Sequence, residues 1–177
     1  LSFKNLKAVA LSKIGDYQNA IKLYDDVLVE NPGYSKIWHS FGHTLKTAGL
    51  LERAIAVYRK SIELEPAYGE ACWSLANLKT FRFTDQDVGE MCRQLESERL
   101  TDEERFHFDF ALGKAMEDRK DYHEAFRHYE KGNALRRKLI DYSPERNAGK
   151  VALSKKTFSA DFFRERTGYG NASSEPI

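Results

Sequence analysis

The sequence predicts an all-α protein in which a pair of antiparallel helices is repeated along the chain, and three observations support this prediction. First, 31% of the 177 residues are charged, and only eleven glycines and four prolines interrupt them, which favours helices with solvated outer faces. Second, small, aromatic and proline residues recur at one fixed spacing. Third, helix start and stop residues divide the chain into segments of ordinary helix length.

The repeat is clearest in the first 68 residues, where four marker positions recur 34 residues later. The glycine of each set fits the left-handed position that closes a helix, and the proline ends the next helix. The pattern returns at Asp121-Tyr122-His123-Glu124-Ala125, which lies 105 residues after the first copy, or three periods plus a three-residue insertion. The matched pairs are Gly15 and Gly49, Ala20 and Ala54, Tyr24 and Tyr58, and Pro32 and Pro66.

The marker residues have a physical reason, which is the close approach of two antiparallel helices. Gly42 and Ala54 must be small where the helices of a pair nearly touch, while Trp38, Leu45 and Tyr58 fill the space on either side. The expected helices span residues 3–14, 17–30, 36–48, 51–64, 70–82, 85–97, 103–118 and 122–141, followed by 144–157 and 159–166.

The third copy of the repeat is partly eroded. Its first helix keeps the expected apolar residues, but Val88, Cys92 and Leu95 stand where an alanine, an aromatic and a small residue are expected. Thr101 and Glu104 form a capping box that begins the fourth copy.

These residues resemble the tetratricopeptide repeat (TPR) family. The resemblance implies a right-handed α-solenoid with TPR units at 1–34, 35–68, 69–102 (degenerate) and 103–142. Residues 143–166 are then expected to form a capping helix and a short helix, and residues 167–177 a linker to a downstream domain.

The same resemblance implies a concave groove, lined by the first helix of each unit, that binds a protein or peptide. Trp73 is either an anchor for that ligand or a packing residue, and the sequence leaves both readings open. The groove residues that the family pattern implies are Asn5, Val9, Lys36, His39, His43, Lys46, Trp73, Asn77, His107, Phe110 and Lys114.

No residue pattern predicts catalysis, a cofactor or a metal site in this chain. His39 and His43 have the i, i+4 spacing that can hold a metal, but the sequence shows no third ligand beside them, so the pair is expected to contact a peptide or to be solvated. The net charge of +1 argues against nucleic acid and anionic membrane as partners, and no apolar run reaches the length of a membrane span. Cys72 and Cys92, which lack metal-ligand spacing, are expected to be buried, reduced thiols of a cytoplasmic protein.

A second resemblance covers about 70 residues near the C-terminus. It rests on Phe108 to Ala115, Tyr122 to Phe126, the Tyr-x-Lys-Gly-Asn-Ala-Leu-Arg block from Tyr129 to Arg136, and Thr157 to Asn171. This run resembles the last TPR unit and linker of bacterial TPR–sulfotransferase fusion proteins. In that family Glu175-Pro176-Ile177 leads into a Pro-Arg-Ser-Gly-Thr-Thr loop that binds 3′-phosphoadenosine 5′-phosphosulfate.

Three functional hypotheses follow. The chain is expected to be a protein-interaction domain that recruits an acceptor for an attached sulfotransferase. Alternatively, it mediates self-association with another copy or packs on its own C-terminal catalytic domain. In a third reading the parent enzyme is another transferase, such as a glycosyltransferase.

Overall fold

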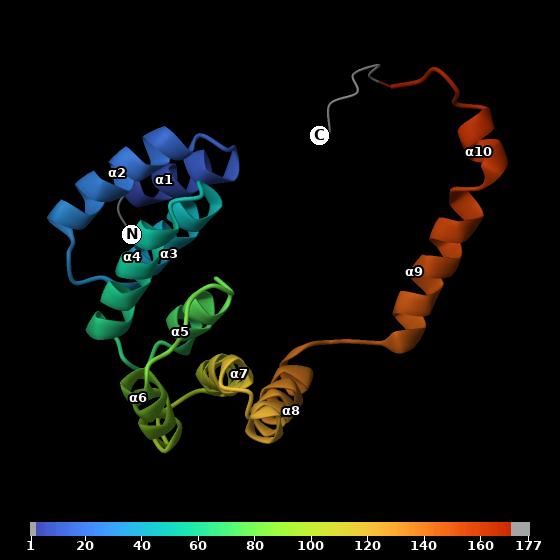
Figure 1. The fold of residues 1–177 in the computed structure, drawn as a ribbon. Helices are drawn as coiled ribbons and strands as arrows, with labels where there is room; N and C mark the ends of the chain where they lie inside the picture. The colour runs from blue at the N-terminus through green and yellow to red at the C-terminus, as the bar shows by residue number, and fades with distance from the viewer. Residues whose placement is uncertain (1–2, 171–177) are drawn as a thin grey trace. The chain divides into compact units, whose positions relative to one another are not determined.

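The computed structural model describes residues 3–170, and in that range every regular element is a helix (Figure 1). The first compact unit ends at Leu139 and the second begins at Ile140. The first holds α1 (Phe3–Lys13), α2 (Tyr17–Glu30), α3 (Ser35–Thr47), α4 (Leu51–Leu64), α5 (Gly69–Ala76), α6 (Asp85–Leu95), α7 (Asp102–Asp118) and α8 (Tyr122–Leu139); the second holds α9 (Pro144–Thr157) and α10 (Ala160–Arg164).

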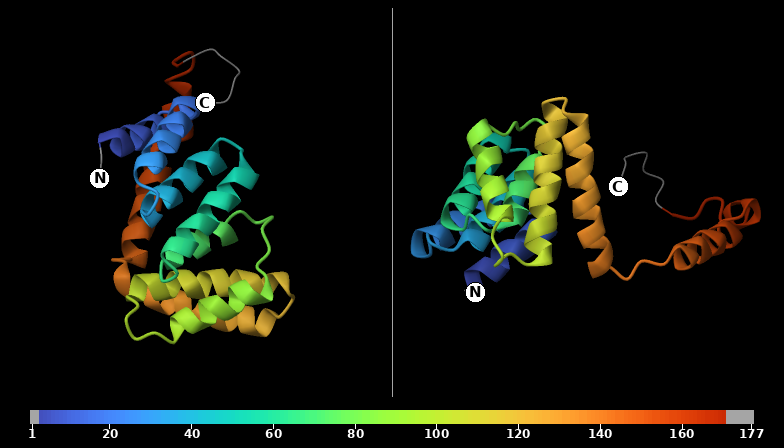
Figure 2. Two further views of the ribbon diagram at one scale, coloured as in Figure 1. Left: turned by 90° about the vertical axis from the view of Figure 1, so that its left-hand side faces the viewer. Right: turned by 90° about the horizontal axis from the view of Figure 1, so that it is seen from below.

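Helices α1 and α2, α3 and α4, and α7 and α8 pack as antiparallel pairs, as the views in Figures 1 and 2 show. The small residues of the repeat lie where the members of each pair approach. Ala20 and Ala54 are fully buried, and a Cβ atom added to Gly42 would lie 2.4 Å from the Tyr58 ring. The predicted all-helical fold is therefore confirmed, and three of its expected helix pairs are present in the described residues.

The turn inside each of these pairs has the same backbone geometry. Gly15 (φ 85°) and Gly49 (φ 79°) are left-handed, as predicted, and Lys120 (φ 63°) takes that position between α7 and α8. The recurring turn satisfies the last carbonyls of the preceding helix in the Schellman manner. The bonds run from the amide of Asp16 to the Leu11 carbonyl (2.9 Å), from Leu50 to Leu45 (2.9 Å) and from Asp121 to Met116 (3.0 Å).

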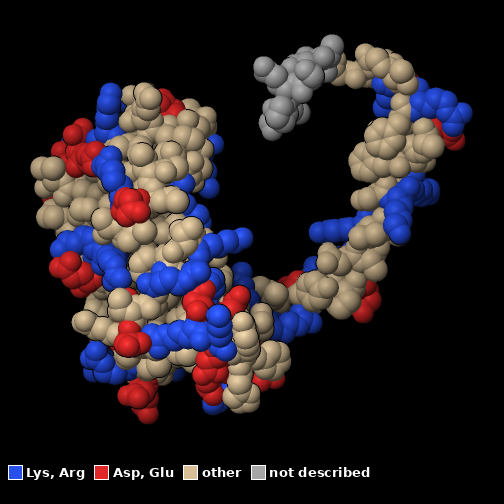
Figure 3. Space-filling model, viewed as in Figure 1, with Lys and Arg blue, Asp and Glu red and all other residues tan. Residues whose placement is uncertain are grey.

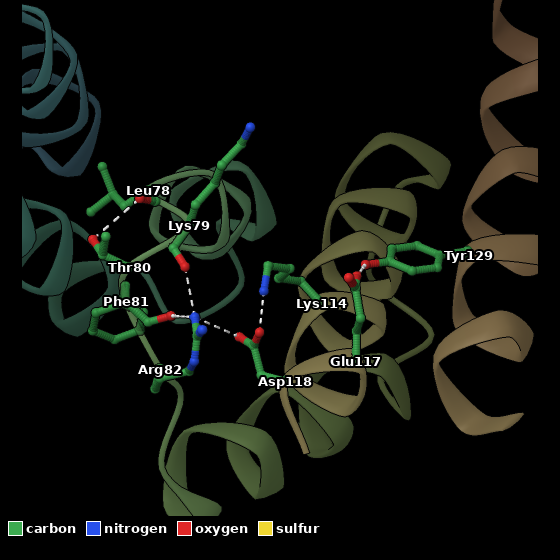
Figure 4. Close-up of polar contacts among 9 residues, drawn as sticks. All are labelled: Leu78, Lys79, Thr80, Phe81, Arg82, Lys114, Glu117, Asp118 and Tyr129. Atoms are coloured by element: carbon green, nitrogen blue, oxygen red, sulfur yellow. Dashed lines mark hydrogen bonds and ion pairs between the residues drawn. The ribbon is translucent and has the colours of Figure 1, made fainter. Parts of the chain in front are cut away.

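The third unit departs from the prediction, because the helix expected over 70–82 ends at Ala76. Lys79 is left-handed (φ 60°), and Arg82 donates to the carbonyls of Lys79 (2.6 Å) and Phe81 (3.1 Å). Arg82 also pairs with Asp118 of α7 at 3.2 Å (Figure 4). The two carbonyl bonds lie within the loop over residues 77–84, and the ion pair links this loop to α7.

The core of the first unit has two parts. The first is formed by buried residues of α1 to α5 and contains the stacked rings of Tyr24 and Phe41, whose centroids are 5.1 Å apart. The second lies between α5 and α7 and is covered by α6. Ile62 and Phe83 pack against both parts, so apolar packing is continuous through the unit.

The second unit contains the two helices predicted near the C-terminus. Ser143 and Ser159 cap α9 and α10 through backbone amides at 3.1 and 3.2 Å, and Pro144 occupies the first turn of α9. That α9 caps the repeats stays a prediction. The predicted linker over 167–177 lies, from residue 171 onward, outside the described residues.

Candidate binding groove

A hollow of about 650 Å³ lies where α1 meets α3, at the N-terminal end of α3. Its wall is largely apolar, and Leu6 and Tyr34 remain 57% and 63% exposed. Large apolar side chains in this state offer contact area to a ligand. The hollow is lined by Asn5, Leu6, Val9, Asn31, Gly33, Tyr34, Ser35, Lys36, Ile37, Ser40, Leu64 and Glu65.

Two further hollows continue this surface along the first helices. One of about 450 Å³ shares Val9 and Ser40 with the first hollow and extends toward the C-terminal end of α3. Another of about 360 Å³ shares Lys36 and Glu65 with it and reaches α5 and α7. The three hollows thus form one surface over α1, α3, α5 and α7, which we call the groove.

Charge is unevenly distributed along the groove. The hollow toward α7 has Glu65, Glu70, Glu103 and Glu104 in its wall, against Lys36 as its only full cation among the described lining residues. On the face of the first unit drawn in Figure 3, charges of both signs are interspersed. The groove therefore runs from an apolar part at α1 to an acidic part at α7.

The structure places five of the predicted groove residues in these walls. Asn5, Val9 and Lys36 line the first hollow, His43 the second, and Lys36 with His107 the third. Asn5 and His39 are buried, so a peptide in the groove would contact little of either side chain. Asn77 follows the end of α5 instead of lying within a helix. Lys114 is half-buried and paired with Asp118 of its own helix (Figure 4), and Lys46 is half-buried on α3.

Trp73 and Phe110, the two predicted aromatic anchors, pack against each other. Their ring centroids are 5.3 Å apart, and Phe110 also meets Phe106 edge-on at 5.8 Å. Trp73 contacts the second part of the core and is half-buried. The contact joins α5 to α7. Much of the Trp73 side chain is therefore used in packing between these helices and is not free for a ligand.

A polar cluster lies between α3 and α5. His39 Nδ1 and Nε2 bond to the Tyr68 hydroxyl (3.0 Å) and the Ser74 hydroxyl (2.8 Å), and the Tyr68 hydroxyl donates to Glu70 Oε2 (2.9 Å). His43 Nδ1 bonds to the Tyr58 hydroxyl at 3.0 Å. Burial, followed by the charge of His43, lowers the pKa of His39 to about 4. Burial also lowers the pKa of His43, with Lys46 as a second cause.

Sequence reasoning missed two parts of this geometry. The linker residues Asn31, Gly33 and Tyr34 line the first hollow, although only helical positions were expected to do so. Glu70 lies beside His39 and His43, although 27 residues separate it from the nearer histidine. Glu70 lies on the first helix of its unit, as His39 and His43 do on theirs, but only the rotation between neighbouring units brings it to the pair.

Comparison with known proteins identifies the class. Residues 5–33 and 35–68 each match a model of the tetratricopeptide repeat, and these stretches contain most of α1 and all of α2, α3 and α4. Residues 5–68 therefore contain two tetratricopeptide repeats. In the described residues, no helix has the length and apolar character needed to cross a membrane.

Solved structures of MamA share this fold. The fragment MamA 41-end from Desulfovibrio magneticus RS-1 is 21% identical, with a TM-score of 0.54 over 78% of this chain and 76% of that one. Another MamA crystal structure is 18% identical, with a TM-score of 0.53 over 97% of this chain and 98% of that one. At this identity the likeness shows the fold alone.

One curated relative also matches, an uncharacterized protein of Aquifex aeolicus (strain VF5). It is 24% identical over 146 residues, which cover 82% of this chain. The match spans only 19% of the length of that relative.

Proposed function

We propose that the chain is a protein-interaction scaffold that binds an extended polypeptide segment in the groove. The observation that supports this most directly is the sharing of lining residues among the three hollows, because it gives one continuous surface over four helices. Extended segments held in such grooves typically bind with micromolar Kd, about −8 kcal/mol.

The distribution of charge suggests what the segment contains. Leu6, Val9 and Tyr34 favour aliphatic or aromatic side chains at the α1 end. Glu70 and Glu103 favour lysine or arginine at the α7 end, where complementary charge adds to specificity and association rate. The preferred ligand is then a segment with an apolar part and a basic part.

A phage-displayed library of random peptides tests this proposal. Selected peptides are expected to combine apolar and basic residues, and their binding is measured by fluorescence polarisation. Ser40→Trp fills the point where two hollows meet and is expected to weaken binding about tenfold or more, equivalent to ~1.4 kcal/mol. Ala56→Trp, on an exposed position of α4, is the matched control and leaves affinity unchanged.

Charge reversal provides a second variant if Ser40→Trp disturbs folding. Glu103→Lys, at an exposed residue, is expected to weaken basic peptides more at low salt than at high salt. Peptides that bind all variants equally would show that they dock elsewhere. Light scattering over a range of concentrations separates this proposal from self-association, in which another copy fills the groove.

We further propose that the scaffold presents an acceptor to an attached sulfotransferase. Support comes from the sequence resemblance of residues 108–171 alone, in particular the block from Tyr129 to Arg136. The DNA that follows the Ile177 codon tests it. A Pro-Arg-Ser-Gly-Thr-Thr loop is expected soon after that codon, whereas a glycosyltransferase domain there would refute the proposal.

A further inference from the structure

Three side chains with metal-binding atoms converge where α3 faces α5. His39 and His43 lie one turn apart on α3, with ring centroids separated by 4.4 Å, and Glu70 comes from the first turn of α5. Each offers one ligand atom, and these atoms all lie within 4.8 Å of one another. Two histidines at i and i+4 on one helix, with a carboxylate from elsewhere, form an established ligand set for zinc.

In each histidine, the ring nitrogen that would not bind the cation already has a hydroxyl partner. His39 Nε2 lies 2.8 Å from Ser74 Oγ, and His43 Nδ1 lies 3.0 Å from the Tyr58 hydroxyl. With a cation on His39 Nδ1 and His43 Nε2, these other nitrogens carry the protons and donate them to the two hydroxyls. Such partners fix the tautomer and the ring orientation of ligating histidines in proteins.

The Tyr68 hydroxyl occupies the space between two of the three ligands. It lies 3.0 Å from His39 Nδ1 and donates to Glu70 Oε2 at 2.9 Å. It therefore links the two atoms that a cation would bridge, and a cation must displace it.

We propose that His39, His43 and Glu70 bind a divalent transition-metal ion of the zinc type. Two imidazoles and one carboxylate suit Zn²⁺, whereas Mg²⁺ and Ca²⁺ prefer all-oxygen sites. His43 and Glu70 each line one of the hollows of the groove, so a cation would reach these two ligands from the groove. This site goes beyond the proposed function, since it adds a cation to the surface at which the polypeptide binds.

Calorimetric titration of chelator-treated chain with Zn²⁺, without any peptide, tests the proposal. One equivalent is expected to bind, and His43→Ala and Glu70→Gln are each expected to weaken binding about tenfold or more. His123→Ala removes an exposed histidine of α8 and serves as the matched control, with affinity unchanged. Circular dichroism establishes that each variant folds, and Co²⁺ as a spectroscopic substitute is expected to give the visible bands of a tetrahedral site.

Tyr68→Phe separates a metal site from a hydrogen-bonded cluster. Because the phenol competes with the cation, its removal is expected to retain or tighten Zn²⁺ binding. Binding that is unaffected by His43→Ala and Glu70→Gln, or absent in both the unchanged chain and Tyr68→Phe, would overturn the proposal. The three side chains would then serve only to join α3 to α5.

Discussion

Replacing Gly42 by alanine tests the close approach of α3 and α4 on which the repeat depends. The new Cβ atom would lie 2.4, 2.6 and 2.8 Å from three atoms of the Tyr58 ring. Carbon atoms prefer separations of about 3.5–4.0 Å, so the ring or the helix must move by about 1 Å. Tyr58 is fully buried and bonded to His43, which leaves it little freedom to move.

The expected cost follows from three contributions. Overpacking costs about 1–3 kcal/mol, and loss of the Tyr58 hydrogen bond adds about 1 kcal/mol. The better helix propensity of alanine offsets about 1 kcal/mol. We therefore expect Gly42→Ala to lower the free energy of unfolding by about 1–3 kcal/mol, measured by urea unfolding followed by circular dichroism.

Comparison with Gly89→Ala separates the packing contribution at Gly42 from the change in helix propensity. Gly89 lies inside α6 with no atom within 4 Å of its added Cβ, so only propensity changes and a gain of about 0.5–1 kcal/mol is expected. Gly42→Ala combined with Tyr58→Leu should recover part of the packing loss. Equal unfolding midpoints for Gly42→Ala and Gly89→Ala would refute the reasoning.

Three other variants or reactions test neighbouring features. Ala54→Leu overpacks the same helix contact from α4 and should cost about 1–3 kcal/mol in urea unfolding; an unchanged midpoint would contradict this. Cys72 is buried as predicted (3% exposed), and burial raises its thiol pKa to about 12, whereas Cys92 is exposed, contrary to the prediction. Iodoacetamide at pH 8 should therefore label one thiol in the folded chain and two in urea. Asp118→Ala leaves Arg82 and Lys114 without their shared partner and should cost about 1–3 kcal/mol, with faster amide exchange over residues 77–84 as the specific sign.

Local chemistry explains which parts of the fold could be predicted. The bounds expected for α2 and α4, 17–30 and 51–64, agree with the structure, because a left-handed glycine precedes each helix and a proline follows it. The capping box of Thr101 and Glu104 is also confirmed, with bonds of 2.7 and 3.2 Å. These devices act within a few residues, so the sequence displays them directly.

The sequence-based predictions are wrong where residues far apart in the chain determine the local structure. The end of α5 depends on Arg82 and on its pairing with Asp118, which is 36 residues further along the chain. The convergence of Glu70 with His39 depends in the same way on how one unit is rotated against the next. The periodic pattern fixes which residues share a helix face, but the rotation follows from packing between units.

The third unit shows what replaces the hairpin contact where the small residues are lost. With Val88 at the place of the alanine, α6 does not approach α5 as α2 and α4 approach their partners, and α5 instead packs its backbone closely against α7. Gly69 allows this approach, because a Cβ atom added there would lie 2.5 Å from the carbonyl oxygen of Glu104.

The carbonyl of Glu104 belongs to a helix backbone, so it cannot rotate away as the end of a flexible side chain can. Gly69 is the first residue of α5, where replacing glycine by alanine stabilises the helix little. Gly69→Ala is therefore expected to cost about 3 kcal/mol, at the upper end of overpacking, and to loosen α7 and α8 before α1 to α4. Amide hydrogen exchange measures the opening of α7 and α8 separately from that of α1 to α4. Uniform exchange, or unchanged stability, would mean that the continuity of the array past the eroded repeat does not depend on this contact.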